Sequence, residues 1–498
     1  MTTPAYVPSR PVLPPALDEA AHRCLVAGFD GTTTVPDALK RLVDRGLGGV
    51  ILFTRNVRDA DQVRELTGTL RALRPDLLVA IDNEGGGIGH LAGAGAPEVP
   101  GNWALGVVDD PALTAYCADA LAGHLATLGI TVSYAPVADV QRRPENPIVR
   151  TRSFGSDPEL VSRHLHAWIA ATESRGIASC AKHFPGHGGT VTDSHHELAV
   201  DPRPYAELDL APFRAAISAG VPMLMSAHVV FPALDPDRPA TLSPRILGDL
   251  LRDELGFDGV LVSDALEMKA IADRYGEAAG ARLALAAGAD QVIVAVPDLD
   301  TTLACRDAVL DALASGELSE ERVTEAAGRV VRLAKRYAAP PARQTVARWD
   351  GAAGLDAARR AVRSGGPLPP PVPGAHVVDL FPPPHPALNW GGEDLLTALR
   401  ALDPTATGTA VAGQPGDPDT VVAQALRAAE GRPLVVAVCD AGLHPWQRRL
   451  RDALLAARPD AVRVSTGLPE PGEKDSVHAY GRGRVNLRAV AEALVGAV

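Results

Sequence analysis

Short apolar runs alternate with longer amphipathic stretches over the first two thirds of the chain, and the two kinds of segment predict different elements. Runs rich in Val, Ile and Leu predict eight buried strands, at residues 24–28, 49–53, 77–82, 131–135, 178–183, 222–228, 260–264 and 291–296. Between them, apolar residues recur at spacings of three and four, the period of a helix with one buried face. Such helices are predicted at residues 60–73, 158–175, 244–255 and 275–287.

Strands that each lead into a helical segment predict an α/β fold with a parallel sheet. A doubly wound open sheet would alternate in the same way, but eight repeats over roughly 300 residues favour a closed (β/α)8 barrel of the TIM type. A further helix over 320–337, with Ser319 as its N-cap, is expected to close this region.

The composition changes after the barrel region. Pro- and Ala-rich passages at 340–343 and 364–374 predict an extended linker, because consecutive prolines favour the polyproline II conformation. Beyond it, strands at 375–380, 433–439 and 461–465 and helices at 444–457 and 486–498 predict a smaller α/β sandwich domain. We therefore expect a catalytic barrel at 1–338, a linker at 339–374 and a C-terminal domain at 375–498.

Charge and cysteine content narrow the class of protein. The formal net charge of −12 argues against nucleic acid or an anionic membrane as a partner. The cysteines are odd in number and dispersed, which is typical of reduced thiols rather than of a disulfide framework. Neither a signal-peptide core nor an apolar stretch of membrane-spanning length is recognisable. These observations predict a cytoplasmic protein.

The densest set of reactive side chains follows the fifth predicted strand. The segment KHFPGHGGTVTDSHH, residues 182–196, runs from that strand into a glycine-rich loop. In a barrel, the carboxyl ends of the strands carry the catalytic groups. His183 and His187 have the spacing of a helical zinc pair, but Pro185 and Gly186 between them exclude a helix. A looser His/Asp metal site and a solvated loop with structural histidines both stay open as alternatives.

Other predicted strand ends carry charged side chains as well. Asp264 ends the run GVLVSD and could be a functional carboxylate or a helix N-cap. Asp82 ends LLVAID and precedes glycines that allow a ligand to approach the backbone closely. The loop NPIVRTRSFG presents Arg150 and Arg152.

Taken together, these segments resemble a known family. KHFPGHGGTVTDSHHELAVD resembles the signature of glycoside hydrolase family 3, in its β-N-acetylglucosaminidase branch. IDNEGG, TRSFGSDP, MSAHVVFPALDP and GVLVSDALEMKAI agree with it, and HPWQ and TGLP are similar to endings of the two-domain members.

The resemblance implies a retaining, exo-acting hydrolase that releases terminal β-linked N-acetylglucosamine from a small saccharide or glycoside, with no metal or organic cofactor. It implies that Asp264 is the nucleophile that forms a covalent glycosyl-enzyme, with His195 as general acid/base and Asp193 as its orienting partner. The sugar-binding positions that it implies are Asp82, Arg152, Lys182 and His183, with His228 in the same pocket.

The chain departs from the family pattern after the third strand. Members usually carry arginine soon after Glu-Gly-Gly, whereas this chain reads EGGGIGHL over 84–91, with His90 at the position of the second arginine. Either another basic group such as Arg150 substitutes, or the sugar preference has shifted.

Three other functions stay open. An imidazole acid/base repels phosphate less than a carboxylate does, so the same residues could serve a β-N-acetylglucosaminide or β-glucoside phosphorylase. Lys182 at a barrel strand end could form a Schiff base in an aldolase. A non-catalytic sugar-binding sensor is the third, although Asp193, His195 and Asp264 are all retained.

Overall fold

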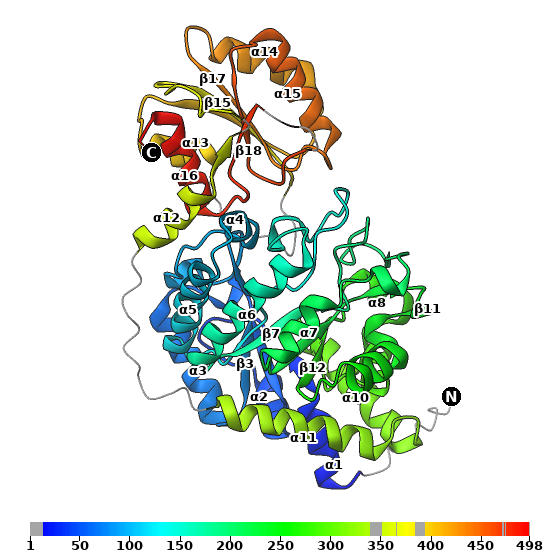
Figure 1. Ribbon diagram of the computed structural model, residues 1–498. Helices are drawn as coiled ribbons and strands as arrows, with labels where there is room; N and C mark the ends of the chain where they lie inside the picture. Colours follow the sequence, from blue (N-terminus) through cyan, green and yellow to red (C-terminus); the bar gives the residue numbers. More distant parts are fainter. Residues whose placement is uncertain are drawn as a thin grey trace, which may run out of the picture.

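The chain folds into a barrel domain and a smaller α/β domain that sits on one end of it (Figure 1). The computed structural model describes residues 13–338, 351–364, 366–383, 394–470, 473 and 475–497. Within these residues, no helix is long and apolar enough to span a lipid bilayer.

Parallel strands close the barrel in the order β1-β13-β12-β9-β7-β6-β3-β2. They are β1 (Leu25–Ala27), β2 (Gly49–Leu52), β3 (Leu78–Ile81), β6 (Val132–Ser133), β7 (Ala178–Phe184), β9 (Met223–Ser226), β12 (Val260–Ala265) and β13 (Gln291–Val294). Each falls within or overlaps one of the eight strands that the sequence predicts, so the prediction of a (β/α)8 barrel is confirmed.

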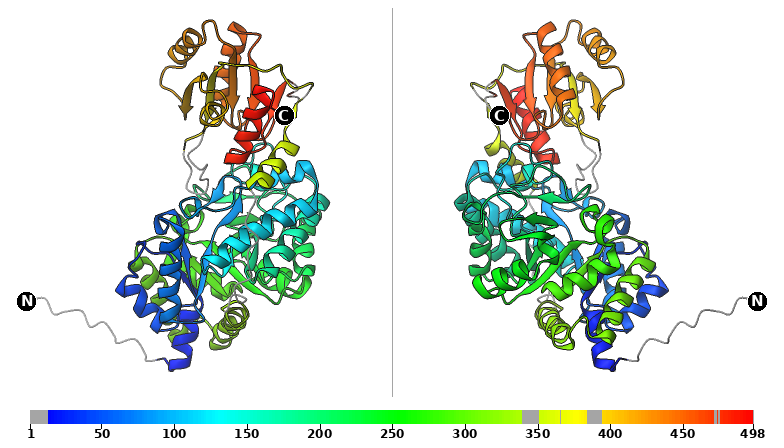
Figure 2. Two further views of the ribbon diagram at one scale, coloured as in Figure 1. Left: turned by 90° about the vertical axis from the view of Figure 1, so that its left-hand side faces the viewer. Right: turned by 90° about the vertical axis from the view of Figure 1, so that its right-hand side faces the viewer.

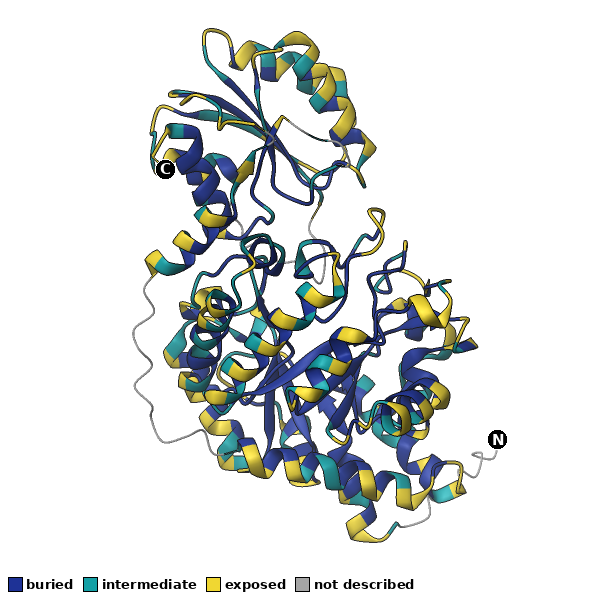
Figure 3. Ribbon diagram, in the orientation of Figure 1, coloured by how far each residue is buried: buried dark blue, intermediate teal, exposed yellow. Residues whose placement is uncertain are grey.

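Helices surround the strands, which are the most buried part of the barrel (Figure 3). They are α1 (Pro15–Arg23), α2 (Asp37–Asp44), α3 (Ala60–Leu73), α4 (Asn102–Val108), α5 (Pro111–Thr127), α6 (Pro158–Ser174), α7 (Ala211–Ser218), the π-helix η6 (Arg245–Glu254), α8 (Lys269–Tyr275), α9 (Glu277–Ala287), α10 (Leu299–Ser315) and α11 (Glu320–Tyr337). Short strands decorate the loops: β4 (Asn83–Gly85), β5 (Ile88–Gly89), β8 (Ala199–Val200), β10 (Val229–Phe231) and β11 (Asp235–Pro239).

Helix α11 closes one end of the barrel. Its Val330, Leu333 and Tyr337 join the cluster of apolar side chains that fills the barrel interior. The helix therefore leaves the opposite end, where the strands finish, for the loops that carry polar groups. The helix predicted at 275–287 begins two residues later, as α9, because Gly276 adopts φ 73° and separates it from α8.

The C-terminal domain is a sheet covered by helices on both faces. Its strand order is β14-β19-β18-β17-β15-β16, with β14 (Arg363–Ser364), β15 (His376–Phe381), β16 (Thr407–Ala412), β17 (Leu434–Val438), β18 (Val462–Ser465) and β19 (Ser476–His478). Apolar side chains of α13 (Leu395–Arg400) and α16 (Arg484–Val495) cover one face, and those of α14 (Pro418–Ala428) and α15 (Pro445–Ala457) cover the other. The closing helix ends before residue 498 because Gly496 takes a left-handed conformation.

The passage expected to be a linker contains regular structure. Helix α12 (Gly351–Ala361) packs against α16 and α4, and β14 pairs antiparallel with β19. Residues 340–343 lie outside the described residues. The domain boundaries at 338 and 374 stay a prediction. However, β14, a strand of the C-terminal sheet, lies within the predicted linker. Figure 2 shows α12 at the junction of the two domains.

The predicted N-cap of α11 offers a test of the fold. The Ser319 side chain accepts a hydrogen bond from the Arg322 amide at 3.1 Å. We expect Ser319→Ala to lower the free energy of unfolding by about 1 kcal/mol, because one helical N–H then loses its partner. Calorimetric melting of the full chain measures the change. Ser319→Asp, which keeps an acceptor, is the control, and equal losses in both variants would contradict the capping role.

Candidate active site

A cavity of about 290 Å³ opens where the barrel strands end. Its charged and imidazole side chains come from the ends of several barrel strands and from the segments that follow them: Asp82, Glu84, His90, Arg152, Lys182, His183, His195, Asp264 and Glu267. Six of the eight residues singled out from the sequence are in this set, and the other two lie behind it. The barrel thus gathers groups that are as much as 185 residues apart in the chain, from Asp82 to Glu267.

Asp264 lies at the end of β12. Its Oδ1 accepts a hydrogen bond from the Ala265 amide at 2.8 Å. Burial raises the pKa of this carboxyl, but the imidazoles of His183, His228 and His195 and that amide outweigh burial and hold it below its ordinary value. The carboxylate is therefore ionised at neutral pH, as a nucleophile must be.

His195 is oriented by Asp193. Its Nδ1 is 2.8 Å from Asp193 Oδ1, and its backbone amide donates to the same oxygen at 2.9 Å. The carboxylate fixes Nδ1 as the protonated nitrogen of the neutral ring and leaves proton exchange with a ligand to Nε2. Asp193 supports the imidazole from outside the cavity.

Lys182 and Arg152 form a buried charge network with two carboxylates. Lys182 Nζ is 2.6 Å from Asp82 Oδ1 and 2.7 Å from Glu84 Oε1. Arg152 meets both oxygens of Glu84, at 2.9 and 2.8 Å, in the bidentate geometry that guanidinium favours. Burial lowers the pKa of Lys182, but the Asp82 and Glu84 carboxylates outweigh burial and raise it. The network holds a permanent cation on the cavity wall.

His183 is held by a residue that the sequence did not single out. Its Nδ1 is 2.7 Å from Asp139 Oδ2, and the amide of His187 donates to Asp139 Oδ1 at 2.7 Å. Burial raises the pKa of Asp139, but both imidazoles outweigh burial and lower it. A carboxylate soon after the fourth barrel strand was the available signal. Glu84 and Glu267 were also missed, although both occur in segments quoted for the family.

The loop after β7 is fixed from within. His187 Nδ1 is 2.9 Å from Thr190 Oγ1 and its Nε2 is 3.0 Å from Ser194 Oγ. Gly188 passes so close to the preceding loop that an added Cβ would lie 1.7 Å from the Val140 carbonyl oxygen. Glycine is required there by the close contact of two backbones.

His228 is not among the residues that line the cavity. Its Nδ1 is 2.8 Å from Thr241 Oγ1, and its Nε2 is 3.0 Å from the carbonyl oxygen of Ala265. The side chain therefore supports the end of β12 from behind, and burial lowers its pKa. Its place in the sugar pocket, which the resemblance implies, stays a prediction.

The sequence has no arginine soon after Glu-Gly-Gly, and the structure shows where Arg150 and His90, the two residues considered in its place, lie. Arg150 turns away from the cavity and pairs with Asp440 of the C-terminal domain. His90 itself lines the cavity, with Nδ1 2.9 Å from Thr54 Oγ1 and its ring 5.2 Å from that of Phe53. Burial lowers the pKa of His90, so a neutral ring stands in this position.

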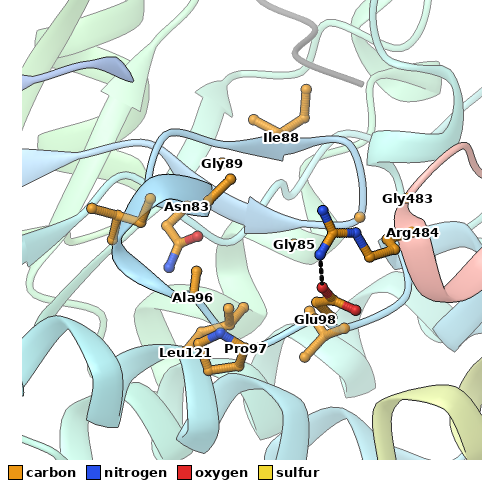
Figure 4. Close-up of a pocket in the computed structure, with 15 residues that line it drawn as sticks. Asn83, Gly85, Ile88, Gly89, Ala96, Pro97, Glu98, Leu121, Gly483 and Arg484 are labelled. Carbon is orange, nitrogen blue, oxygen red and sulfur yellow. Dashed lines mark hydrogen bonds and ion pairs between the residues drawn. The ribbon is translucent and has the colours of Figure 1, made fainter. Parts of the chain in front are cut away.

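Behind the β4–β5 hairpin lies a second cavity, of about 180 Å³ (Figure 4). The Asn83 side chain points into it, and its Nδ2 has no partner among the described residues. At its edge, Arg484 of the C-terminal domain forms an ion pair with Glu98. One hairpin thus separates this cavity from the one that contains Asp264.

No group of three or more His, Cys, Asp and Glu side chains is arranged to hold a metal ion in the part of the chain that the structure describes.

Comparison with known proteins gives consistent matches. Residues 27–333 match the family described as "Glycosyl hydrolase family 3 N terminal domain". "Beta-hexosaminidase A" of Pseudoalteromonas piscicida is 34% identical over 60% of this chain, which spans 55% of that protein's length. "Beta-hexosaminidase" of Alkalilimnicola ehrlichii is 38% identical over 54% of this chain and 80% of its own. A glycoside hydrolase family 3 β-N-acetylglucosaminidase from Paenibacillus sp. FPU-7 superposes with TM-score 0.88 at 33% identity, and covers 97% of both chains.

The buried imidazole of His187, in the loop after β7, is expected to make the stability of the protein depend on pH. Burial lowers the pKa of its imidazole to about 4, whereas an unfolded histidine titrates near 6.5. Between these values the unfolded chain binds more protons, so the free energy of unfolding falls as the pH falls, by up to about 1.4 kcal/mol per pH unit from this residue. We expect His187→Gln to flatten the pH dependence of the melting temperature between about pH 4 and 6.5. Exposed His166→Gln is the control; equal pH slopes in the two variants would contradict the expectation.

Proposed function

Since the chain belongs to glycosyl hydrolase family 3, we propose that it is a retaining, exo-acting hydrolase that releases terminal β-linked N-acetylglucosamine. The observation that carries the proposal is that one cavity is lined by the ionised carboxylate of Asp264 and by the His195 ring, which Asp193 orients. Retaining hydrolysis requires this pair of groups: a nucleophile and a proton donor.

In the proposed first step, Asp264 attacks the anomeric carbon while His195 gives a proton to the leaving oxygen. The bond to the aglycone breaks and a covalent glycosyl-enzyme forms. In the second step, His195 takes a proton from water, which attacks the same carbon and releases Asp264. Asp193 stabilises the imidazolium whenever His195 is protonated, since its carboxylate lies 2.8 Å from Nδ1.

The proposed sugar-binding groups are Asp82, Lys182, Arg152 and His183. All line the cavity, and charge-assisted hydrogen bonds from such groups to hydroxyls are strong enough to orient a sugar. A cavity of about 290 Å³ is small for a binding pocket and suits the end of a saccharide rather than an internal segment. The N-acetylglucosamine preference is supported by the names of the relatives, and the neutral His90 is the feature by which this chain could differ from them.

A phosphorylase is the second candidate, because the proton donor facing the cavity is an imidazole rather than a carboxylate. An anionic phosphate acceptor would meet less repulsion at such a group. The Schiff-base aldolase is disfavoured, since ion pairing raises the pKa of Lys182 and a Schiff base requires the neutral amine. A sugar sensor would not need the Asp193–His195 pair.

We further propose that the enzyme acts in the cytoplasm on small saccharides or glycosides. All five cysteines are free and buried, which suits a reducing compartment.

The nucleophile assignment predicts the largest loss of activity. We expect Asp264→Asn to lower kcat on p-nitrophenyl β-N-acetylglucosaminide by about 10⁴-fold or more, because an amide cannot form the glycosyl-enzyme. Release of p-nitrophenol measures turnover, and NMR of the first product formed identifies its anomer. Exposed Asp300→Asn is the control. Retained turnover in Asp264→Asn, or an inverted first product, would remove Asp264 from this role.

The role proposed for Asp193 predicts a smaller loss of kcat than the one expected for Asp264→Asn, together with a change in pH dependence. Asp193→Asn keeps a side chain of the same shape but removes the charge that stabilises the imidazolium, so we expect kcat to fall by about 10² to 10⁴-fold. The activity of this variant should depend on pH differently from that of the unmodified enzyme. An unchanged pH–rate profile would show that Asp193 does not act through His195.

Phosphate distinguishes the two candidate functions. For a hydrolase we expect the same turnover with and without added phosphate, with free sugar as product. Stimulation by phosphate, with sugar 1-phosphate as product, would identify a phosphorylase. A parallel assay with the β-glucoside reports sugar preference, and turnover of the glucoside alone would overturn the N-acetylglucosamine assignment.

A further inference from the structure

One short turn of the barrel domain contacts both the active site and the C-terminal domain. This turn, η3 (Arg150–Arg152), lies in the loop that follows β6. At its end, Arg152 holds Glu84 on the wall of the cavity. At its start, Arg150 points the other way, and its Nη2 lies 2.5 Å from Asp440 Oδ1 in the C-terminal domain.

The contact between Arg150 and Asp440 is buried. The two residues are 7% and 8% exposed, so water screens their charges little. Asp440 follows β17, and its Oδ1 also accepts a hydrogen bond from the Leu468 amide at 2.8 Å. The C-terminal domain therefore presents this carboxylate in a fixed direction.

The backbone of Arg150 depends on such support. Its φ is 45°, in the left-handed region that residues with a Cβ seldom occupy. Its amide donates to Gln141 Oε1 at 2.8 Å and its Nη1 donates to the Pro144 carbonyl at 2.6 Å. A conformation of this kind persists when surrounding contacts determine it, and Asp440 supplies one such contact from outside the loop.

The same loop also contacts the segment that carries the proposed acid/base. Asn146 Nδ2 donates to the carbonyl oxygens of His187 at 2.9 Å and Thr190 at 3.1 Å. The Arg142 amide donates to the Gly188 carbonyl at 3.1 Å. A displacement of the loop would therefore reach the loop that leads to His195 as well as Arg152.

We infer that Asp440 is a positioning residue for the active site, acting through Arg150 to hold η3 and so to place Arg152 and Glu84 against the sugar. The inference rests on the proposed function for its substrate. It assigns the C-terminal domain a part in substrate binding although Asp440 does not line the cavity.

Two further ion pairs near the domain junction provide controls. Arg360 pairs with Asp110 at 2.9 Å, and the Arg360 side chain is 44% exposed. Arg484 pairs with Glu98 at the edge of the second cavity (Figure 4). Neither pair involves η3, so removing one of them weakens the domain junction without releasing the turn.

The test compares Asp440→Asn, Asp440→Glu and Arg360→Gln in the full chain. Asp440→Asn keeps an acceptor for the Leu468 amide but leaves Arg150 without its counter-charge. We expect KM for p-nitrophenyl β-N-acetylglucosaminide to rise about tenfold and kcat to fall by less than that, because Arg152 grips the sugar in ground state and transition state alike, whereas His195 is reached only through the bonds of Asn146 and Arg142 to its loop. Asp440→Glu should recover part of this loss, and Arg360→Gln should match the unmodified enzyme.

Hydrogen exchange gives a readout that does not depend on turnover. We expect amides of residues 141–155 to exchange at least about tenfold faster in Asp440→Asn, and at the unmodified rate in Arg360→Gln. Should Asp440→Asn fail to fold, Arg150→Met removes the pair from the barrel side and is expected to give the same two results.

The outcomes separate the two proposals. An active unmodified enzyme together with unchanged KM and exchange in the Asp440 or Arg150 variant would overturn the positioning role alone. Equal effects in Arg360→Gln would also overturn it, since they would reflect a general loosening of the junction. Absence of glycosidase activity in the unmodified enzyme would overturn the proposed function, and the exchange rates would then still decide whether Asp440 holds the turn.

Discussion

Two cations and two carboxylates meet at the end of the barrel, where Lys182 and Glu84 are buried and Asp82 is half-buried, and the charges of these groups neutralise one another. The side chains of Lys182 and Glu84 are 3% and 2% exposed, so neither charge could remain there without its partner. Loss of one member of such a pair typically costs about 3–5 kcal/mol, because the other charge is left uncompensated. Asp82 and Arg152 complete the set. The network joins the segments at the ends of β3, β6 and β7, and it holds the cavity wall in place without a ligand.

A second set of contacts fixes the histidines. Asp139 binds both His183 and the His187 amide, so one carboxylate orients a cavity side chain and the start of the loop that leads to His195. His228 supports the end of β12 from behind. Asp139 and His228 hold cavity side chains and the end of β12 in place without lining the cavity themselves. The site is therefore preorganised by groups that an inspection of the cavity alone would overlook.

The barrel could be predicted from the sequence because most of its strands lie in short, mainly apolar runs that are buried on both faces, and helical periods follow them. The strand ends then indicated Asp264, Asp82 and the segment 182–196. Asp139 could not be selected in this way, since a carboxylate beyond a strand has no pattern that reveals its partner. Edge strand β16 was missed because its residues are half-exposed and small, and β14 because it is too short to show a period. The sequence left open whether Arg150 replaces the expected arginine, because sequence spacing does not report which way a left-handed residue directs its side chain.

The pairing of β14 with β19 joins the first and last strands of the C-terminal sheet, in chain order, at one edge. Helix α12 immediately precedes β14 and packs on α16, the last helix of the chain. During synthesis, α12 and β14 must therefore wait for β19 and α16 before they can pack. The first half of the barrel is complete long before that, so the domain junction is assembled last. A C-terminal fragment intended to fold alone would have to begin before α12 rather than at the proline-rich passage that follows it.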